Sequence, residues 1–440
     1  MRKFRFIAPL MAGALAVSAC TASPGGSGGA SGGGAGDIPE GDGEIIVTSL
    51  WGGAEEEAFQ AVLDAFEAST GITAVYEANR TDYATVLRTR IQGGNPPDVA
   101  IIPGIGTLRS LAREGSLISL GDLGIDRTEI EGNYAPGLLD VGVVDGNIYA
   151  LMVKLNSKAA IWYDPQRFAA MNVEPAETWD DLVALTAAIK ETGTNPWALG
   201  AGDSWTLTDW FEITYLKMHG PEAYDTLFSP EGDWTDSTVT ETINKLFGEL
   251  LTADYVDGGV DGSLATLFVA AIGKVFSTSP TAELYCCGGF VGGIATGGDV
   301  NPALAGQEGE AITFFDFPVV SGTGEGQITY GGDVMAALVR DTDVAAFMEY
   351  LATPEAGEIW AAGGTIISPL IDVDTSVYPN VNVQAEAEQI ASATAVRFDG
   401  SDLLPGTDLG AVLQSAFRGE AIGPLLETFQ AATETAWENE

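Results

Sequence analysis

Residues 44–71 read EIIVTSLWGGAEEEAFQAVLDAFEASTG and contain the alternation that decides the fold class. The β-branched apolar run 44–50 predicts a strand, and the two glycines after Trp51 turn the chain toward a helix. Gly71 follows this helix at the place of a C-cap. The helix carries apolar residues at helical spacing, namely Phe59, Val62, Leu63 and Phe66.

The alternation continues beyond Gly71. Residues 72–77 predict a strand, 82–92 a helix and 97–102 a third strand. Strands that alternate with helices at this spacing indicate the α/β class with a mostly parallel sheet. Ligands of such sheets bind beyond the carboxyl ends of the strands, where the Trp51 turn is expected to lie.

The rest of the chain repeats both kinds of element. An extended segment is expected over 147–163, and Thr178 opens a helix with a capping box that uses Asp181. The other predictions are helices at 181–191, 209–218, 238–251 and 344–351, strands at 311–320 and 328–339, and helical structure over 391–440.

The first 20 residues have the pattern of a bacterial secretory signal. Three bases within residues 1–5 precede an apolar run that is too short for a permanent membrane anchor. The run ends in VSAC at 17–20, which is similar to a lipobox. This pattern predicts a signal peptide over 1–19 and lipidation of Cys20; an ordinary signal peptide that ends near Ala19 is the alternative.

The tether and the charge limit the possible partners. Residues 20–43 consist mostly of Gly, Ser, Ala and Pro and predict a flexible tether. With 19 basic and 62 acidic residues, the formal net charge is −43, which repels nucleic acid and anionic membrane surfaces. Membrane contact is therefore expected only through the lipid anchor. One histidine and three cysteines exclude a polyhistidine metal centre and a zinc ribbon, and we predict neither a metal nor a cofactor.

Several short segments point to a family. They are FEASTGI at 66–72, GGNPPDV at 93–99, NYAPG at 133–137, VKLNSK at 153–158 and YLATPEA at 350–356. In this order the segments resemble the extracellular solute-binding proteins of ABC importers, in the sugar-binding branch. The stretch RFDGSDLLP at 397–405 is similar to a signature of α-glucoside-type binding proteins.

The resemblance implies a two-lobed fold that closes on its ligand. The chain crossings are expected near 151–157, 328–334 and 368–376. The first lobe is expected to hold 44–152 and 333–370, and the second lobe 156–330 and 376–440. The implied protein is a monomer without enzymatic activity, lipid-anchored at the outer face of the cytoplasmic membrane, that captures a carbohydrate and delivers it to an ABC permease.

A sugar offers hydroxyls above an apolar ring face, so its site needs flat aromatic rings and hydrogen-bonding side chains. Trp51 follows the first strand, and its alternative role is a plug of the first lobe. Trp205 lies in a polar, turn-like segment that favours binding. Asp209 and Trp210 are expected to begin a helix, where Trp210 is either a ligand contact or a core residue.

Lys154, Asn156 and Lys158 are expected to share one face of a strand, because side chains two residues apart point the same way. Apolar flanks favour a polar face that opens into the cleft between the lobes over a solvated edge strand. Asn156 is the strongest single candidate.

The resemblance implies five further candidates, and the sequence departs from the family pattern at one place. Asp82 and Tyr83 follow the second strand, although Asp82 is also a candidate helix cap. Asp333 lies at an expected crossing. Arg397 and Asp399 form either a cleft pair on a loop or a structural salt bridge. The segment 406–418 lacks the aromatic-rich helix of α-glucoside binders, and its only aromatic residue is Phe417.

Cys286 and Cys287 are adjacent in a chain that is predicted to be exported, where oxidation is permitted. A disulfide in a rigid loop near the cleft is favoured over two buried thiols. Two other functions stay open at this point. One is a binder of another solute, such as a polyamine, an oligopeptide or an osmolyte, which Lys154 and Lys158 disfavour. The other is a secreted glycosidase that uses two carboxylates.

Overall fold

The structure is a computed structural model that describes residues 37–79, 83–102, 104–135, 137–298, 300–322 and 324–439. The signal peptide, Cys20 and most of the expected tether therefore lie outside the described residues, and so does Asp82. None of the helices in the described ranges has both the length and the apolar character that a membrane span requires.

The first sheet contains the strands that opened the sequence. Its order is β12-β11-β3-β1-β2, and β6 pairs with the other edge of β11. These strands are β1 (Glu44–Ser49), β2 (Thr73–Ala78), β3 (Val99–Ile102), β6 (Ala150–Ser157), β11 (Gln327–Ala337) and β12 (Ala395–Phe398). β1 runs parallel to β2 and β3, whereas β11 runs antiparallel to β3 and β6. β12 runs parallel to β11, so most strand pairs of this sheet are parallel, as predicted. The sheet is nevertheless mixed, because β11 enters it in the opposite direction to β3 and β6.

The predicted strand–helix alternation is confirmed in the first lobe. The helix after Trp51 ends at Gly71, whose φ of 79° is the left-handed conformation that a C-cap favours. The helices of this lobe are α1 (Ala54–Thr70), α2 (Tyr83–Gln92), α3 (Ile105–Arg113), α4 (Arg127–Ile130), α13 (Thr342–Leu351) and α14 (Pro354–Ala362), beside a hairpin of β4 (Val143–Val144) and β5 (Asn147–Ile148).

The second lobe is built on a sheet of order β10-β7-β9-β8. Its strands are β7 (Ala160–Tyr163), β8 (Asn195–Trp197), β9 (Ala282–Cys286) and β10 (Thr313–Asp316). Its helices are α5 (Pro165–Met171), α6 (Trp179–Glu191), α7 (Trp205–His219), α8 (Pro221–Leu227), α9 (Ser237–Lys245), α10 (Gly259–Leu264), α11 (Phe268–Phe276), α12 (Val291–Thr296), α17 (Leu409–Phe417) and α18 (Ile422–Asn439). The capping box of Thr178 and Asp181 is confirmed at the start of α6.

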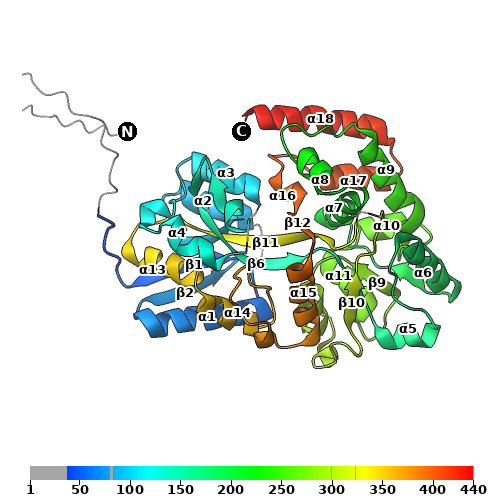
Figure 1. Cartoon of the computed structure of the whole chain (residues 1–440), viewed down its shortest axis with the longest axis horizontal. Helices are drawn as coiled ribbons and strands as arrows, with labels where there is room; N and C mark the ends of the chain where they lie inside the picture. The colour runs from blue at the N-terminus through cyan, green and yellow to red at the C-terminus, as the bar shows by residue number, and fades with distance from the viewer. Residues whose placement is uncertain are drawn as a thin grey trace, which may run out of the picture. The chain divides into compact units, whose positions relative to one another are not determined.

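The two lobes have separate hydrophobic cores, and β6 and β11 run between them (Figure 1). The first core includes Phe59, Phe66 and Trp360, and the second includes Trp197, Trp210 and Trp234. Two short helices, α15 (Val381–Ser392) and α16 (Gly400–Leu403), lie close to this crossing. Two cores joined by shared strands make a two-lobed α/β fold.

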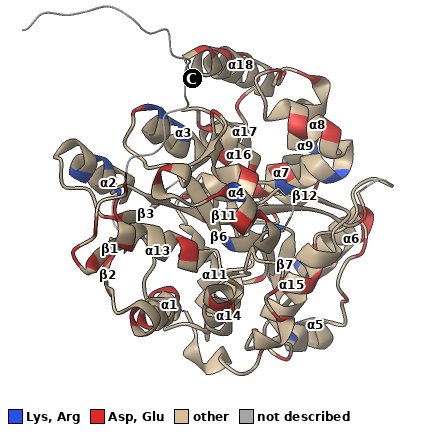
Figure 2. Ribbon diagram, turned by 60° about the vertical axis from the view of Figure 1, so that its left-hand side comes forward, with Lys and Arg blue, Asp and Glu red and all other residues tan. Residues whose placement is uncertain are grey.

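The structure corrects two predicted elements. Residues 391–440 are not all helical, because β12 extends the first sheet beside β11. The helix that contains Asp209 begins at Trp205, so Trp205 occupies the first turn of α7 rather than a loop. Acidic positions are spread along the helices of both lobes, and basic positions are few (Figure 2).

Candidate ligand-binding site

The site is centred on the antiparallel pair β6–β11. Asn156 faces Gly331 and Lys154 faces Asp333 across this pair. A Cβ on Gly332 would lie 2.3 Å from the carbonyl oxygen of Lys154, so glycine is required for the close approach of the two strands. This approach places the side chains of Lys154 and Asp333 in contact.

Asn156 presents an open amide at the crossing. Its neighbour Ser157 is held by α15 on the other face of the strand, where the Ser157 N–H donates to Glu386 Oε1 at 2.7 Å and the hydroxyl bonds Gln389. Because side chains alternate along a strand, Asn156 points away from α15. Its exposure is only 9%, yet no described residue hydrogen-bonds its amide. Nearly buried amides are usually paired, so this one is available to a ligand.

On the first lobe, Trp51 orients Asp333. The Trp51 Nε1–H donates to Asp333 Oδ2 at 3.0 Å, while Lys154 pairs with Glu55 and lies 3.8 Å from the same Asp333 oxygen. Trp51 is 2% exposed and packs edge-on against Phe59 and Trp360, each at 5.1 Å. Trp51 therefore has the alternative role considered above, as a core residue that offers no ring face to a ligand.

On the second lobe, Lys158 is surrounded by carboxylates and rings. Its ammonium lies 2.9 and 3.0 Å from the two oxygens of Asp209 and 3.6 Å from Asp399 Oδ2. The same nitrogen lies 4.9 Å from the centre of the Trp205 ring and 5.7 Å from that of Phe290. Both distances are within the range of cation–π attraction.

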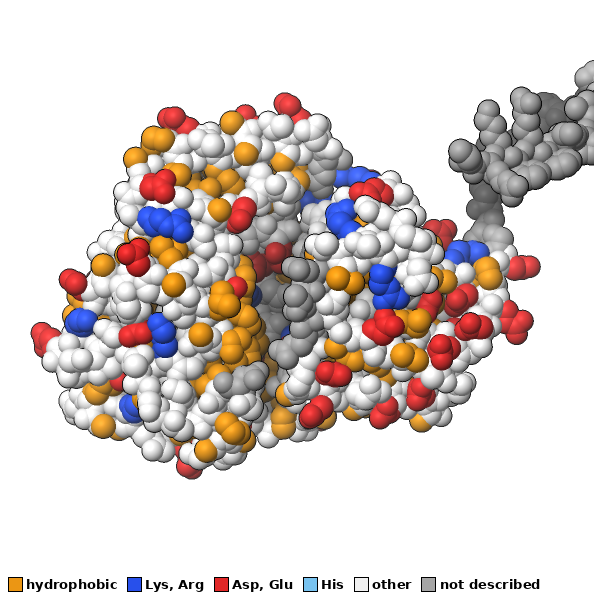
Figure 3. Space-filling view, turned by 180° about the vertical axis from the view of Figure 1, so that it is seen from behind, with side chains coloured by type: hydrophobic (Ala, Val, Ile, Leu, Met, Phe, Trp, Pro, Cys, Tyr) orange, Lys and Arg blue, Asp and Glu red, His pale blue; other side chains and the backbone are white. Residues whose placement is uncertain are grey.

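Three aromatic rings form a partly exposed wall on this lobe. Trp205 packs edge-on against Phe268 at 5.2 Å and Phe290 at 6.0 Å, and the adjoining Leu267 is 56% exposed. Figure 3 shows a hollow between the lobes, with hydrophobic side chains along its wall on the second lobe and acidic side chains inside it. Of the three candidate tryptophans, Trp205 is the one with a partly exposed ring.

The charges at the crossing depend on burial. Burial alone would lower the pKa of Lys158, but Asp209 and Asp399 outweigh it and raise that pKa above the usual value. Burial raises the pKa of Asp209, and Lys158 opposes the shift. Lys158 therefore stays protonated at neutral pH.

Glu212, one helical turn after Asp209, holds the start of α16. It accepts hydrogen bonds from the backbone N–H groups of Gly400 at 2.5 Å and Ser401 at 3.0 Å, and from the Tyr224 hydroxyl at 2.6 Å. Burial raises its pKa well above the ordinary value. This anchor fixes Asp399, the N-cap of α16, beside Lys158.

Asp402 connects the charged groups of the two lobes. The surrounding protein and the neighbouring Asp399 raise the pKa of Asp402 to about 7, although the residue is exposed. Asp209 of the second lobe and Asp333 of the first act on it in the same direction. The pKa of Asp402 thus responds to carboxylates of both lobes.

Three candidates predicted from the sequence, Trp210, Tyr83 and Arg397, lie away from the space between the lobes. Trp210 is 1% exposed and packs against Trp197 at 5.0 Å in the second core, which was its alternative role. The buried Tyr83 donates its hydroxyl to the backbone oxygen of Ile101 at 2.8 Å, inside the first lobe. Burial raises its pKa, so it remains a hydrogen-bond donor.

Arg397 lies on β12 rather than on a loop. It forms a two-pronged salt bridge with Asp225 at 2.5 and 2.8 Å on the outer surface. Asp399, two residues later, pairs with Lys158 instead. Both predicted roles of the Arg397–Asp399 pair, the cleft pair and the structural salt bridge, were therefore wrong, because each side chain pairs with another residue. Arg397 and Asp399 do not point the same way, because the strand ends at Phe398, between the two residues.

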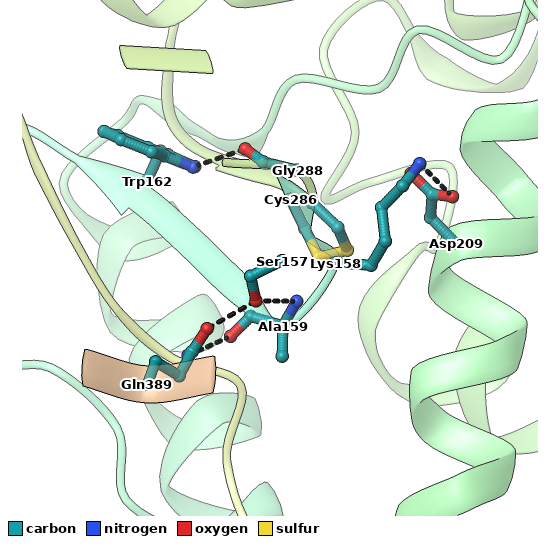
Figure 4. The surroundings of a disulfide bond; sticks show 9 residues. Ser157, Lys158, Ala159, Trp162, Asp209, Cys286, Gly288 and Gln389 are labelled. Atoms are coloured by element: carbon teal, nitrogen blue, oxygen red, sulfur yellow. Dashed lines mark hydrogen bonds and ion pairs between the residues drawn. A yellow bond between two sulfur atoms is a disulfide. The ribbon is translucent and has the colours of Figure 1, made fainter. Parts of the chain in front are cut away.

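A disulfide joins Cys286 and Cys287 at the end of β9, beside Ser157 and Lys158 (Figure 4). Both cysteines are buried. The loop after them is tied to the crossing, because Trp162 Nε1–H donates to the Gly288 oxygen at 2.9 Å and the Gly289 N–H donates to the Ser157 oxygen at 2.8 Å. This loop leads directly to Phe290 of the aromatic wall.

Sequence reasoning missed Phe268, Phe290, Glu212 and Asp402. A signal was present for Phe290, which ends the loop of the cysteine pair, and for Glu212, which shares a helical face with Asp209. Phe268 had no local signal, because only the packing of α11 against α12 brings it to Trp205. Within the described ranges, no group of three or more His, Cys, Asp or Glu residues has a metal-binding arrangement.

A two-lobed α/β fold with an open amide and an aromatic wall at the strand crossing defines a receptor for a small solute. The chain belongs to the family of bacterial extracellular solute-binding proteins, whose pattern it matches over residues 52–358. The resemblance seen in the sequence is thus confirmed.

Similar proteins cover most of the chain. The α-glucosides-binding periplasmic protein AglE of Rhizobium meliloti is 33% identical over 82% of this chain and 80% of its own length. The osmoprotective compounds-binding protein GgtB of Synechocystis sp. is 30% identical over 82% of this chain and 85% of its own length. Among solved structures, a chitin oligosaccharide binding protein superposes with a TM-score of 0.73 at 21% identity, over 89% of this chain and 98% of its own. This last likeness supports the fold.

Proposed function

We propose that this protein captures a carbohydrate and delivers it to an ABC permease. The observation that carries the proposal is the unpartnered amide of Asn156 near a partly exposed aromatic wall. An amide offers both donors and acceptors to adjacent sugar hydroxyls, and an aromatic face packs on the apolar side of the ring. The α-glucoside binder AglE, which is similar over most of its length, supports the same class of ligand.

In this proposal each lobe contributes one side of the site. Asp333 of the first lobe and Asp402 of the second accept hydrogen bonds from hydroxyl groups on opposite sides of the ligand, while Trp205 packs on its ring. Closure takes place about the crossings near 151–157, 328–334 and 368–376. The first lobe comprises 44–152 with 333–370, and the second comprises 156–330 with 376–440.

We propose no catalytic role for the carboxylates of the site. Asp209 and Asp399 both lie against the ammonium of Lys158. This ammonium occupies the position in which a substrate would have to meet a catalytic acid or base. The proposed protein is a monomer that is attached through lipid on Cys20 and the tether 20–43 to the outer face of the cytoplasmic membrane. The permease and the lipid are its proposed contacts there.

An osmolyte is the second candidate class of ligand. The specific support is the similarity to GgtB, whose name gives osmoprotective compounds as its ligands. Neutral polyhydroxy osmolytes and sugars offer the same hydroxyl groups to Asn156, so the two candidates share one kind of recognition.

The test is thermal unfolding and calorimetric titration of the purified mature chain with a panel of solutes. The panel holds α-glucosides, raffinose, chitin and xylan oligosaccharides, neutral polyols, polyamines and short peptides. A solute that binds only the folded state stabilises it and therefore raises the melting temperature. At a ligand concentration of a hundred times Kd, the free energy of unfolding increases by about 2.7 kcal/mol. We expect a neutral polyhydroxy compound to do so.

Asn156→Ala should lose most of this shift, while Asn95→Ala, at an exposed turn of the first lobe, should keep it. A response to polyamines or peptides alone, with none to carbohydrates or polyols, would overturn the proposal.

A further inference from the structure

The surroundings of the Lys158 ammonium are those of a binding site for a cation. Two carboxylates lie within 3.6 Å of it, and the rings of Trp205 and Phe290 lie within 5.7 Å. Aromatic rings combined with carboxylates recognise ammonium ligands, because both the ring faces and the oxygens carry negative charge. We call this set of two carboxylates and two rings the ammonium cage.

The chain fills this cage with its own cation. Lys158 is 8% exposed, and no other lysine or arginine is paired with Asp209 or Asp399 among the described residues. Since the carboxylates raise the pKa of Lys158, the cage holds a positive charge at every physiological pH. A free ammonium ion that enters the space between the lobes therefore meets an occupied cage.

The first lobe repeats this arrangement in a simpler form. The Lys154 ammonium lies 5.8 Å from the Trp51 ring centre and contacts the carboxylates of Glu55 and Asp333. Lys154 and Lys158 come from the same segment of chain, on either side of Asn156. The crossing strand thus supplies a counter-ion to the carboxylates of each lobe.

The overall charge makes such counter-ions necessary for selectivity. A chain with 62 acidic and 19 basic residues attracts small cations from solution by its field alone. Discrimination against them then requires a repulsive element at the site itself. Lys154 and Lys158 are cations that the crossing strand itself supplies.

We propose that Lys158 determines specificity by occupying the ammonium cage, so that the site takes uncharged polyhydroxy solutes and rejects ammonium compounds such as polyamines. The inference rests on the proposed function for the class of ligand, whereas the cage itself is independent of it. Removal of the lysine should convert the cage into a site for a free alkylammonium ion.

The experiment uses Lys158→Ala and n-propylammonium chloride, whose chain resembles the deleted side chain. Binding is measured as the rise in melting temperature and by calorimetry, against sodium chloride at the same ionic strength. We expect K158A to bind n-propylammonium about tenfold or more tightly than the wild-type chain. Tetramethylammonium, a bulkier probe, reports whether the opened cage also accepts quaternary ions.

Lys245→Ala is the matched control. Lys245 lies 4.7 Å from the Trp179 ring centre and pairs with Glu249 at 3.1 Å, so it has one ring and one carboxylate on the surface of the second lobe. K245A should show no more response to n-propylammonium than the wild type. The double variant K158A/D209N should bind the amine more weakly than K158A, because one carboxylate of the cage has lost its charge.

A folded K158A that binds n-propylammonium no better than the wild type would overturn the proposal. If K158A fails to fold, the readout is refolding: n-propylammonium should restore the folded fraction and sodium chloride should not, and equal effects of the two salts would also overturn it. A wild type that binds no carbohydrate or polyol while K158A gains the amine contradicts the proposed function and leaves the cage supported.

Discussion

Two tryptophans at the ends of the site have opposite roles at the scale of single residues. Trp51 is 2% exposed, with its ring between Phe59 and Trp360, and its indole N–H is used by Asp333. Trp205 is partly exposed at the start of α7 and has Lys158 over its face. The same residue type thus serves packing in one lobe and, in the proposed function, contact with solute in the other.

Trp205→Ala should lower ligand affinity roughly tenfold or more, because the ring that packs on the ligand is lost. Trp51→Ala should instead lower the free energy of unfolding by about 3–5 kcal/mol, as truncation of a buried tryptophan does. Chemical denaturation and calorimetric titration of both variants separate the two effects. Trp205→Phe, which keeps a ring, should retain most of the affinity.

A buried carboxyl under the crossing makes stability depend on pH. Burial raises the pKa of Glu386 to about 7, against the opposing hydrogen bond from Ser157 and the charge of Lys154. The folded chain therefore binds this proton more tightly than the unfolded chain. Its contribution to stability is complete below the ordinary glutamate pKa and is lost as the pH rises through about 7.

Glu386→Gln should remove this contribution to the pH dependence. As the pH rises from acidic values to above 7, the free energy of unfolding of the variant should increase by about 3 kcal/mol relative to that of the wild type. Urea unfolding at several pH values measures this difference. Glu388→Gln, on the exposed face of the same helix, is the control and should follow the wild type. Parallel pH profiles of Glu386→Gln and wild type would contradict the prediction.

At the scale of elements, the pair β6–β11 holds the site together through two adjacent glycines. A Cβ on Gly331 would lie 2.7 Å from Lys158 Cε, which is a flexible side chain. A Cβ on Gly332 would lie 2.3 Å from the Lys154 backbone oxygen, which cannot move without the strand. Substitutions at these two positions therefore distinguish an effect on the ammonium cage from an effect on the pairing of the strands.

Gly331→Ala should displace Lys158 and lower ligand affinity with little loss of stability. Gly332→Ala should cost about 1–3 kcal/mol of stability, because the strands must separate locally to relieve the contact. Thermal unfolding together with calorimetric titration distinguishes the two. Equal losses of stability in both variants would show that the lysine side chain does not yield.

The disulfide loop is the second element that shapes the site. It joins the end of β9 to Phe290 through backbone groups that hydrogen-bond Trp162 and Ser157. The loop contacts the crossing from the side of α15, while Phe290 reaches the aromatic wall on the side of Trp205. The position of this ring therefore depends on how the cysteine pair directs the chain.

At the scale of the whole molecule, α3 of the first lobe also contacts the far side of the crossing. Arg109 Nη1 donates to the Leu403 backbone oxygen at 3.0 Å, and its guanidinium lies 5.6 Å from the Trp437 ring centre. Arg113, one turn later, bonds Asp145 within its own lobe. The contact of Arg109 with Leu403 connects the lobes.

Arg109→Ala should weaken the closed arrangement and lower ligand affinity a few-fold, mainly through faster dissociation. Arg113→Ala should leave both quantities near the wild-type values. Stopped-flow dissociation and small-angle X-ray scattering with and without ligand provide the two measurements. Identical dissociation rates for the two variants would exclude a role of the Arg109 contact in closure.

Local patterns predicted much of the fold and part of the site. The first strands and helices, the Gly71 cap and the capping box at Thr178 depend on neighbours in sequence, so they were readable from spacing. The polar face of Lys154, Asn156 and Lys158 followed from strand alternation. β12 and the mixed direction of the first sheet depend on partners that lie far away in the sequence, and no local pattern reports them.

The sequence by itself determined the α/β class, the family and the segment from which the site is built, because these follow from periodicity and from motifs a few residues long. The tertiary structure alone decided which aromatic ring stays open, which carboxylates surround Lys158 and which arginine joins the lobes. Burial and pairing are properties of neighbours in space, and Trp51 and Trp205 become different only when Trp360 packs against one and Lys158 lies over the other.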